Sequence, residues 1–345
     1  MSASWPRERH SSGAGLVRCA LRGRVEDSGP TSASTAPPTH RGAVPVVIRT
    51  HDISREKRRA RRGRHKGVHD HENFQRGFDA LGRLALDGVV VSARALDLAT
   101  GRVLFSVDDS VSMPTASLGT VVLLIEVAVR LANEPHENLR LLDRIAADAV
   151  TGSGIWQHLQ VPSLPIADLA ALVAATSDNL ATNVLLRRVG LDAVRERAEA
   201  LGLSRTALLD VVRDERGPDD APQLSIASAG ELTWLMATLA KGEVVDTSVS
   251  SRVVGWLSLN TDQSLVASAF GLDPLSHRQP DHGVLLVNKT GIDAGVRAEV
   301  GVLRGPRAGV SYSLITQFDD TNLRYRLAVL EGMRTLGVDL IEYVH

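Results

Sequence analysis

Strand-forming segments lie near both ends of the ordered part of this sequence and enclose a long helical block. Five segments are rich in β-branched and apolar residues and are predicted to be strands: Gly88–Leu96, Arg102–Val107, Gly283–Asn288, Ala298–Leu303 and Val310–Thr316. The first two are separated by a short turn, which predicts a hairpin. Two strands, a helical block, three strands and a closing helix indicate an antiparallel sheet faced by helices from the two ends of the chain.

Apolar residues recur at helical spacing through the middle of the chain. The segments concerned are Leu118–Ala132, 140–150, 165–175, 178–188, 192–201 and 227–241, and a last helix is predicted over Thr321–Leu336. The predicted fold class is therefore α+β, with an antiparallel sheet flanked by N- and C-terminal helices and a separate all-helical subdomain. We place this domain at residues 76–345, with sheet parts at about 76–115 and 283–345 and the helical part at about 117–260.

The first 75 residues have a different composition, rich in Ser, Pro, Gly, Arg and His and without a helical or strand period. They predict a disordered basic tail. Its run Arg55–Lys66 holds eight Lys or Arg in twelve positions. Such a run could contact nucleic acid or an anionic surface, although a solvated charge run is the favoured interpretation. The histidines of this tail are not expected to bind a metal.

Composition limits the cellular context. Cys19 is the only cysteine of the 345 residues, so no intrachain disulfide can form. The longest apolar run, Val121–Leu131, contains Glu126 and Arg130 and is interpreted as a buried helix rather than a membrane span. No signal peptide is recognised near the start, so we expect a cytoplasmic protein, or a secreted one if the true start or export signal differs. A monomer is expected.

Three short segments carry candidate chemistry. Ser117 begins the apolar helix, where free N–H groups and the helix dipole favour developing negative charge. Ser177-Asp178-Asn179 opens another helix, and Lys289-Thr290-Gly291 follows the strand Val284–Asn288. Taken singly, the first two are more simply helix caps and the third an exposed turn.

Together, the three segments occur in the order of the S-x-x-K, S-D-N and K-T-G motifs and close to their spacing. The chain thus resembles class A β-lactamases and penicillin-binding proteins over about residues 78–340. The segment GVRAEVGVLRG at 295–305 is most similar to actinobacterial class A-like serine hydrolases.

The resemblance implies a role for each matching residue. Ser117 would be the acylated nucleophile, and Ser177 would pass a proton to the β-lactam nitrogen. Asn179 would hold the substrate's side-chain amide, while Lys289, Thr290 and the strand at Gly291 would hold its carboxylate. The N–H groups of Ser117 and Ile292 would form the oxyanion hole. This chemistry uses a small-molecule substrate, such as a β-lactam or a peptide-like amide or ester, and needs no metal or cofactor.

Two departures from the family pattern concern catalysis. The lysine expected three residues after the nucleophile is Thr120, and threonine cannot act as a general base near neutral pH. The deacylating glutamate pattern E-x-x-L-N is also absent. Asp210, Asp214 and Glu215 are the carboxylates near that place, and ion pairs or solvated loop charges are the simpler interpretation of them.

Three functions follow from these residues. The first is a β-lactamase-like serine hydrolase that is weakened by Thr120. The second is a D-amino-acid peptidase or esterase that uses the same serine. The third is a catalytically inactive binding protein that keeps the cleft as a recognition pocket.

Overall fold

The computed structural model of the protein describes residues 74–345. The predicted basic tail, including the run Arg55–Lys66, lies outside the described residues apart from its last two positions. The helix α1 begins directly after it, at Gln75.

The predicted antiparallel sheet is confirmed, with five strands in the order β2-β1-β10-β9-β8. Each neighbouring pair is antiparallel. The strands are β1 (Val90–Asp97), β2 (Val103–Val107), β8 (Leu285–Asp293), β9 (Val296–Arg304) and β10 (Gly309–Gln317). The pairing of β1 with β10 joins the two ends of the domain, as in the register Ala93↔Leu314. Strand β8 lies at one edge of the sheet.

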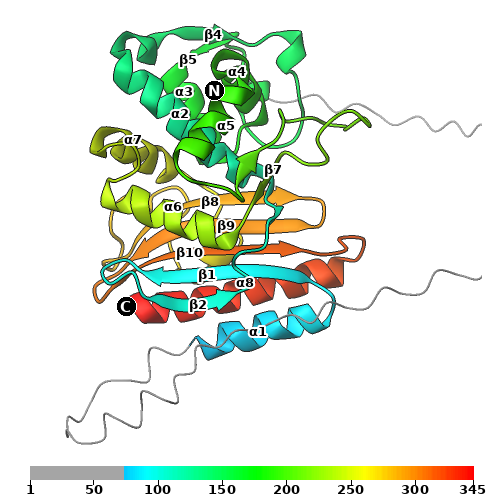
Figure 1. Ribbon diagram of the computed structural model, residues 1–345, viewed down its shortest axis with the longest axis vertical. Coiled ribbons are helices and arrows are strands. Elements are labelled where there is room, and N and C mark those ends of the chain that lie inside the picture. The colour runs from blue at the N-terminus through cyan, green and yellow to red at the C-terminus, as the bar shows by residue number, and fades with distance from the viewer. Residues whose placement is uncertain (1–73) are drawn as a thin grey trace, which may run out of the picture. The chain divides into compact units, whose positions relative to one another are not determined.

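Helices cover both faces of this sheet (Figure 1). The terminal helices α1 (Gln75–Leu86) and α8 (Leu323–Val344) pack together on one face, as the sequence predicts. Helix α6 (Ala229–Lys241) packs on the other face, against β1, β9 and β10. Buried aliphatic side chains therefore fill both layers, and the sheet is a central partition between two hydrophobic clusters.

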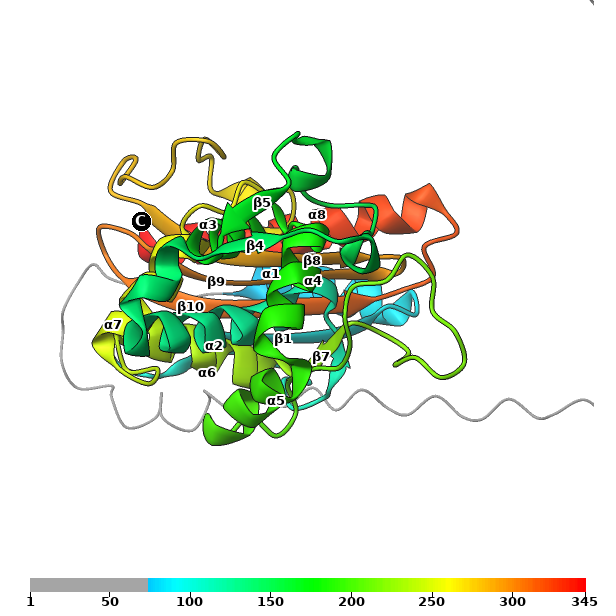
Figure 2. The ribbon, with the colours of Figure 1, turned by 90° about the horizontal axis from the view of Figure 1, so that it is seen from above.

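The remaining helices form a second layer beyond α6 (Figure 1), and seen from above they lie over the sheet (Figure 2). They are α2 (Thr120–Asn133), α3 (Ile166–Thr176), α4 (Asn179–Val189), α5 (Leu191–Ala200) and α7 (Thr247–Leu257). Between them lie four short strands, β4 (Leu141–Asp143), β5 (Ser163–Pro165), β6 (Ala207–Leu208) and β7 (Ser225–Ala227); β7 also pairs with β3 (Met113–Pro114).

The helix predicted over 140–150 is wrong. Leu141–Asp143 pairs instead with Ser163–Pro165, and only a single 3-10 turn, Ala146–Asp148, follows. The partner strand lies some twenty residues away, so local periodicity did not reveal it.

Helix α2 is the most deeply buried helix of this layer, and Leu123, Leu124 and Ile125 have no exposed surface. The stretch Ala116–Asn133 is long and apolar enough to cross a bilayer, but 72% of it is buried inside the fold. It is a core helix, in agreement with the sequence interpretation.

A carboxyl group is buried beneath the sheet on the α8 side. Glu299 of β9 accepts hydrogen bonds from the Tyr312 hydroxyl (2.7 Å), from Asn288 Nδ2 (3.0 Å) and from the Ala267 N–H (3.2 Å). Burial dominates over these hydrogen bonds and raises the pKa of Glu299 to about 7. Between pH 4.5 and 7 the Glu299 carboxyl is therefore protonated in the folded protein, whereas it is ionised in the unfolded chain.

We predict that Glu299→Gln removes a pH dependence of folding. The contribution of Glu299 to the free energy of unfolding is fully present below pH 4.5. It is lost as the pH rises to 7, by roughly 3 kcal/mol in total. Relative to the natural protein, the variant should therefore become steadily more stable across this window. Urea unfolding at a series of pH values measures the difference, with the exposed Glu215→Gln as the control. A difference that stays constant with pH would contradict the raised pKa.

Candidate active site

Ser117 lies in a 3-10 turn, η2 (Ala116–Gly119), that leads directly into α2. Its Oγ is partly exposed and makes no hydrogen bond within residues 74–345, so the hydroxyl is not a helix cap. The preceding residue, Ala116, has a left-handed backbone with φ of 49°. Such strain in a non-glycine residue is typical of functional turns. The turn presents an unengaged hydroxyl at the N-terminal end of a buried helix.

The turn is held from behind by Ser225 of β7, which is completely buried. Its Oγ bonds with the Thr115 hydroxyl (2.8 Å), donates to the Ala116 carbonyl (2.6 Å) and accepts from the Gly119 N–H (3.3 Å). A Cβ on Gly119 would lie 2.3 Å from Ser225 Cβ, so only glycine permits this approach. Ser225 carries no signal in the sequence, because its partners lie more than 100 residues away in the chain.

Strand β8 passes directly beside the same turn. A Cβ on Gly291 would lie 2.1 Å from the Thr115 carbonyl oxygen and 3.1 Å from Leu118 Cγ. Glycine therefore brings the K-T-G segment against the Ser117 turn. The sequence placed this segment after the end of a strand, and that is wrong, because β8 continues through it to Asp293. Pairing with β9 extends the strand.

Lys289 and Ser177 meet between the sheet and the helical layer. The Lys289 ammonium group is fully buried and donates to Ser177 Oγ and to the Thr290 carbonyl (3.1 Å). Ser177 ends α3 in a left-handed conformation (φ 51°), which turns the chain toward α4. Burial lowers the pKa of Lys289 to about 8, although the charge of Asp262 opposes this shift. An amine with this pKa can gain or lose a proton near neutral pH.

The other two residues of the S-D-N segment organise the loop before α3. Asp178 is the N-cap of α4, and its carboxylate also accepts from the N–H groups of Ile155 and Trp156. The Asn179 side-chain amide donates to the Thr151 carbonyl (2.8 Å). Asp178 thus has a supporting role, whereas Asn179 joins the start of α4 to the loop at Thr151.

Thr120 takes the place of the lysine of the S-x-x-K motif. Thr120 is 2% exposed, and its hydroxyl donates to the Ser117 backbone carbonyl (2.7 Å), one helical turn back. The bond satisfies the threonine within the helix backbone. It gives no proton acceptor to the Ser117 hydroxyl.

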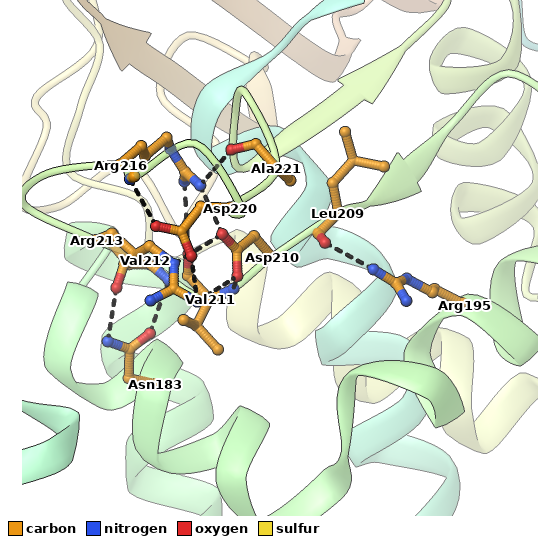
Figure 3. Close-up of polar contacts among 11 residues, drawn as sticks. Asn183, Arg195, Leu209, Asp210, Val211, Val212, Arg213, Arg216, Asp220 and Ala221 are labelled. Carbon is orange, nitrogen blue, oxygen red and sulfur yellow. Dashed lines mark hydrogen bonds and ion pairs between the residues drawn. The ribbon is translucent and has the colours of Figure 1, made fainter.

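The candidate deacylating carboxylates lie on the loop between β6 and β7, and most are engaged. Asp210 is paired with Arg213 (2.8 Å) and Arg216 (2.7 Å), and it accepts from the Val211 N–H (Figure 3). Burial alone would raise the pKa of Asp210. Hydrogen bonds from Arg213, Val211 and Arg216 outweigh burial and lower that pKa, which favours an ion pair over a general base.

The two neighbouring carboxylates differ from Asp210. Asp214 accepts from the backbone N–H (2.9 Å) and hydroxyl (2.8 Å) of Thr151, so it ties this loop to the loop that contacts Asn179. Glu215 is exposed and has no hydrogen-bond or ion-pair partner within residues 74–345. Asn183 of α4 also holds the loop, by a pair of hydrogen bonds with the backbone of Val212 (Figure 3).

One cluster among residues 74–345 has the composition of a metal site. Glu134, His136 and Glu137 place their ligand atoms within 4.8 Å of one another. Glu137, however, is paired with Arg140 (2.7 Å) and Arg188 (2.9 Å), which hold the pKa of its carboxyl below the usual range. These ion pairs explain the cluster, and it shares no residue with the Ser117 site.

This arrangement agrees with comparisons to known proteins. A model of the β-lactamase enzyme family matches residues 76–344. The chain belongs to this family. No curated protein sequence matches the chain.

Solved structures show the same β-lactamase fold. A β-lactamase from Sphaerobacter thermophilus superposes with a TM-score of 0.64 at 22% identity, covering 76% of this chain and 96% of its own. A class A β-lactamase from Mycobacterium abscessus gives 0.62 at 18% identity, with 75% and 97% covered. A mutant of PBP-A, solved as an acyl-enzyme complex with penicillin G, gives 0.62 at 17% identity, with 77% and 95% covered.

We predict that Ser225→Ala loosens the Ser117 turn in this β-lactamase-family protein. Removing the hydroxyl leaves buried donors and acceptors at Thr115, Ala116 and Gly119 unpaired, which should lower the free energy of unfolding by about 1–3 kcal/mol. Amide hydrogen exchange at Leu118 and Gly119 should also accelerate. Ser311→Ala is the matched control, because Ser311 is equally buried but bonds to Thr233. Unchanged exchange in the turn would contradict this support role.

Proposed function

We propose that this protein is a β-lactamase-like serine hydrolase that forms an acyl-enzyme on Ser117, with slow acylation. The observation that supports this most is the buried contact of Lys289 with Ser177. Lys289 lies on β8, the strand that packs against the Ser117 turn. It provides a titratable amine and a hydroxyl relay in one cleft.

In the proposed reaction, Ser117 Oγ attacks the carbonyl carbon of a β-lactam or a related amide or ester. Its proton passes through Ser177 to neutral Lys289, and the oxyanion accepts hydrogen bonds from the N–H groups of Ser117 and Ile292. Strand β8 is an edge strand, and such strands present N–H groups that have no strand partner. As the bond from the carbonyl carbon to the leaving nitrogen (oxygen in an ester) breaks, Ser177 gives its proton to the leaving atom and regains one from Lys289. Asn179, Thr290 and Gly291 would position the substrate.

Two observations favour slow turnover. Thr120 is bonded to the backbone, so the amine usual in the pattern is missing beside Ser117. Asp210 is held by two arginines and Asp214 by Thr151, so of the three candidate carboxylates only Glu215 is unpaired among residues 74–345. Glu215 is exposed on the loop, so the acyl-enzyme should be hydrolysed slowly. A D-amino-acid peptidase or esterase would use the same acylation step.

A second candidate is a catalytically inactive binding protein of the same fold. The Thr120 hydrogen bond to Ser117 is the specific observation in its favour, because it leaves the serine without an adjacent base. The two functions differ in one measurable event, the acylation of Ser117.

We predict that incubation with a reactive cephalosporin adds one acyl group to the natural protein and none to Ser117→Ala, as measured by intact-protein mass spectrometry. Thr120→Lys should acylate faster by about a hundredfold to ten-thousandfold, because general-base catalysis contributes that much. An adduct seen only in Thr120→Lys would favour the binding-protein function. An equal adduct in Ser117→Ala would overturn the assignment of the nucleophile.

The pH dependence of acylation should follow Lys289. Its pKa of about 8 means that the neutral, proton-accepting form increases about tenfold between pH 7 and 9. The acylation rate at saturating substrate should rise by about the same factor, and Lys289→Gln should abolish the rise. A rate that is flat through pH 8 would exclude Lys289 as the base.

A further inference from the structure

A cavity of about 550 Å³ opens between helices α6 and α7 and the strands β8 and β9. Its walls are mainly aliphatic, from Met236, Leu239, Val254, Leu286 and Val302. Among residues 74–345, no aromatic or acidic residue lines it, and neither do Ser117, Ser177 or Lys289. The volume is in the range of about 300–1,000 Å³ that small-molecule sites have.

Two of the three hydroxyl groups in the cavity walls are already paired with the backbone, and the third belongs to Ser251. The Thr247 hydroxyl donates to the Gly242 carbonyl (3.4 Å), and the Ser258 hydroxyl donates to the Gly255 carbonyl (2.8 Å). The interior therefore makes few hydrogen-bonding demands on a ligand. It suits a flexible hydrocarbon chain better than a polar or flat aromatic group.

Three cations line the same cavity and have no carboxylate partner. Lys241 and Arg278 are exposed, and their side chains make no hydrogen bond or ion pair within residues 74–345. Arg304 donates only to the Ala240 carbonyl (3.2 Å), which leaves other N–H groups of its guanidinium free. Basic side chains that have no carboxylate within ion-pair distance among residues 74–345 attract an anionic head group, and arginine can bind a carboxylate through two parallel hydrogen bonds.

We propose that this cavity binds a medium-chain fatty acid. The alkyl chain lies against the aliphatic walls, and the carboxylate lies at the rim among Lys241, Arg278 and Arg304. The site is separate from the candidate active site, and the proposal does not depend on hydrolase activity.

Gly255 offers a direct way to fill the cavity. It lies in the helical segment α7 on the cavity wall, and a Cβ built there meets no atom within 4 Å. A larger side chain at this lining position can therefore be placed without displacing backbone, and it would narrow the opening of the cavity. Leucine is also a better helix former than glycine, which costs roughly 0.8–1 kcal/mol relative to alanine in a helix, so the variant should fold.

The test is calorimetric titration of the full chain with dodecanoate below its micelle concentration. We expect saturable binding with one site, a loss of at least tenfold in affinity for Gly255→Leu, and near-natural affinity for Gly255→Ala. Arg278→Gln and Arg304→Gln should each weaken binding about threefold to tenfold. Arg334→Gln, an exposed arginine on α8, is the matched control and should bind normally.

The head-group requirement is tested with dodecanol and dodecyltrimethylammonium, both of which should bind at least tenfold more weakly than dodecanoate. Equal affinity for all three ligands would mean that Lys241, Arg278 and Arg304 do not contribute to binding, and would overturn the fatty-acid assignment. Absent binding of dodecanoate, or undiminished binding to a folded Gly255→Leu, would overturn the site itself.

Discussion

The fully buried ammonium group of Lys289 is the interaction on which the candidate site depends. A charge without water must be satisfied by nearby oxygens, and here Ser177 Oγ and the Thr290 carbonyl supply them. This requirement fixes the junction of α3 and α4 against the edge of the sheet. It also explains why Ser177 adopts a left-handed backbone, since the hydroxyl must face the strand as the chain reverses.

Close packing extends this arrangement to the turn that carries Ser117. Gly291 lets β8 approach the Thr115 carbonyl, and Gly119 lets the turn rest on Ser225. At each contact an alanine would force backbone apart. The position of Ser117 is therefore set by segments from three distant parts of the chain, and the two glycines are needed where those segments touch.

Much of the fold could be predicted from sequence because its signals are local. The β1–β2 hairpin and the strands β9 and β10 have short apolar, β-branched runs, and α3 to α6 have clear helical periods. The segments that were wrong depend on partners far along the chain. Leu141–Asp143 is a strand only because it pairs with Ser163–Pro165, and β8 continues past Lys289 because β9 lies beside it. The support from Ser225 was likewise invisible, because a buried serine has no sequence signal of its own.

In the proposed reaction, the threonine at position 120 leaves two opposed demands on Lys289. To accept the proton of Ser117 the amine would have to be neutral, but to hold the carboxylate of a substrate it would have to be charged. With a second lysine, the two tasks could be divided between two groups. With a pKa of about 8, Lys289 is mostly charged at neutral pH, which favours binding over proton transfer. As the pH rises the balance reverses, so each gain in acylation is accompanied by weaker substrate binding. A cleft with this single amine is therefore better suited to recognising an anionic substrate than to turning it over rapidly.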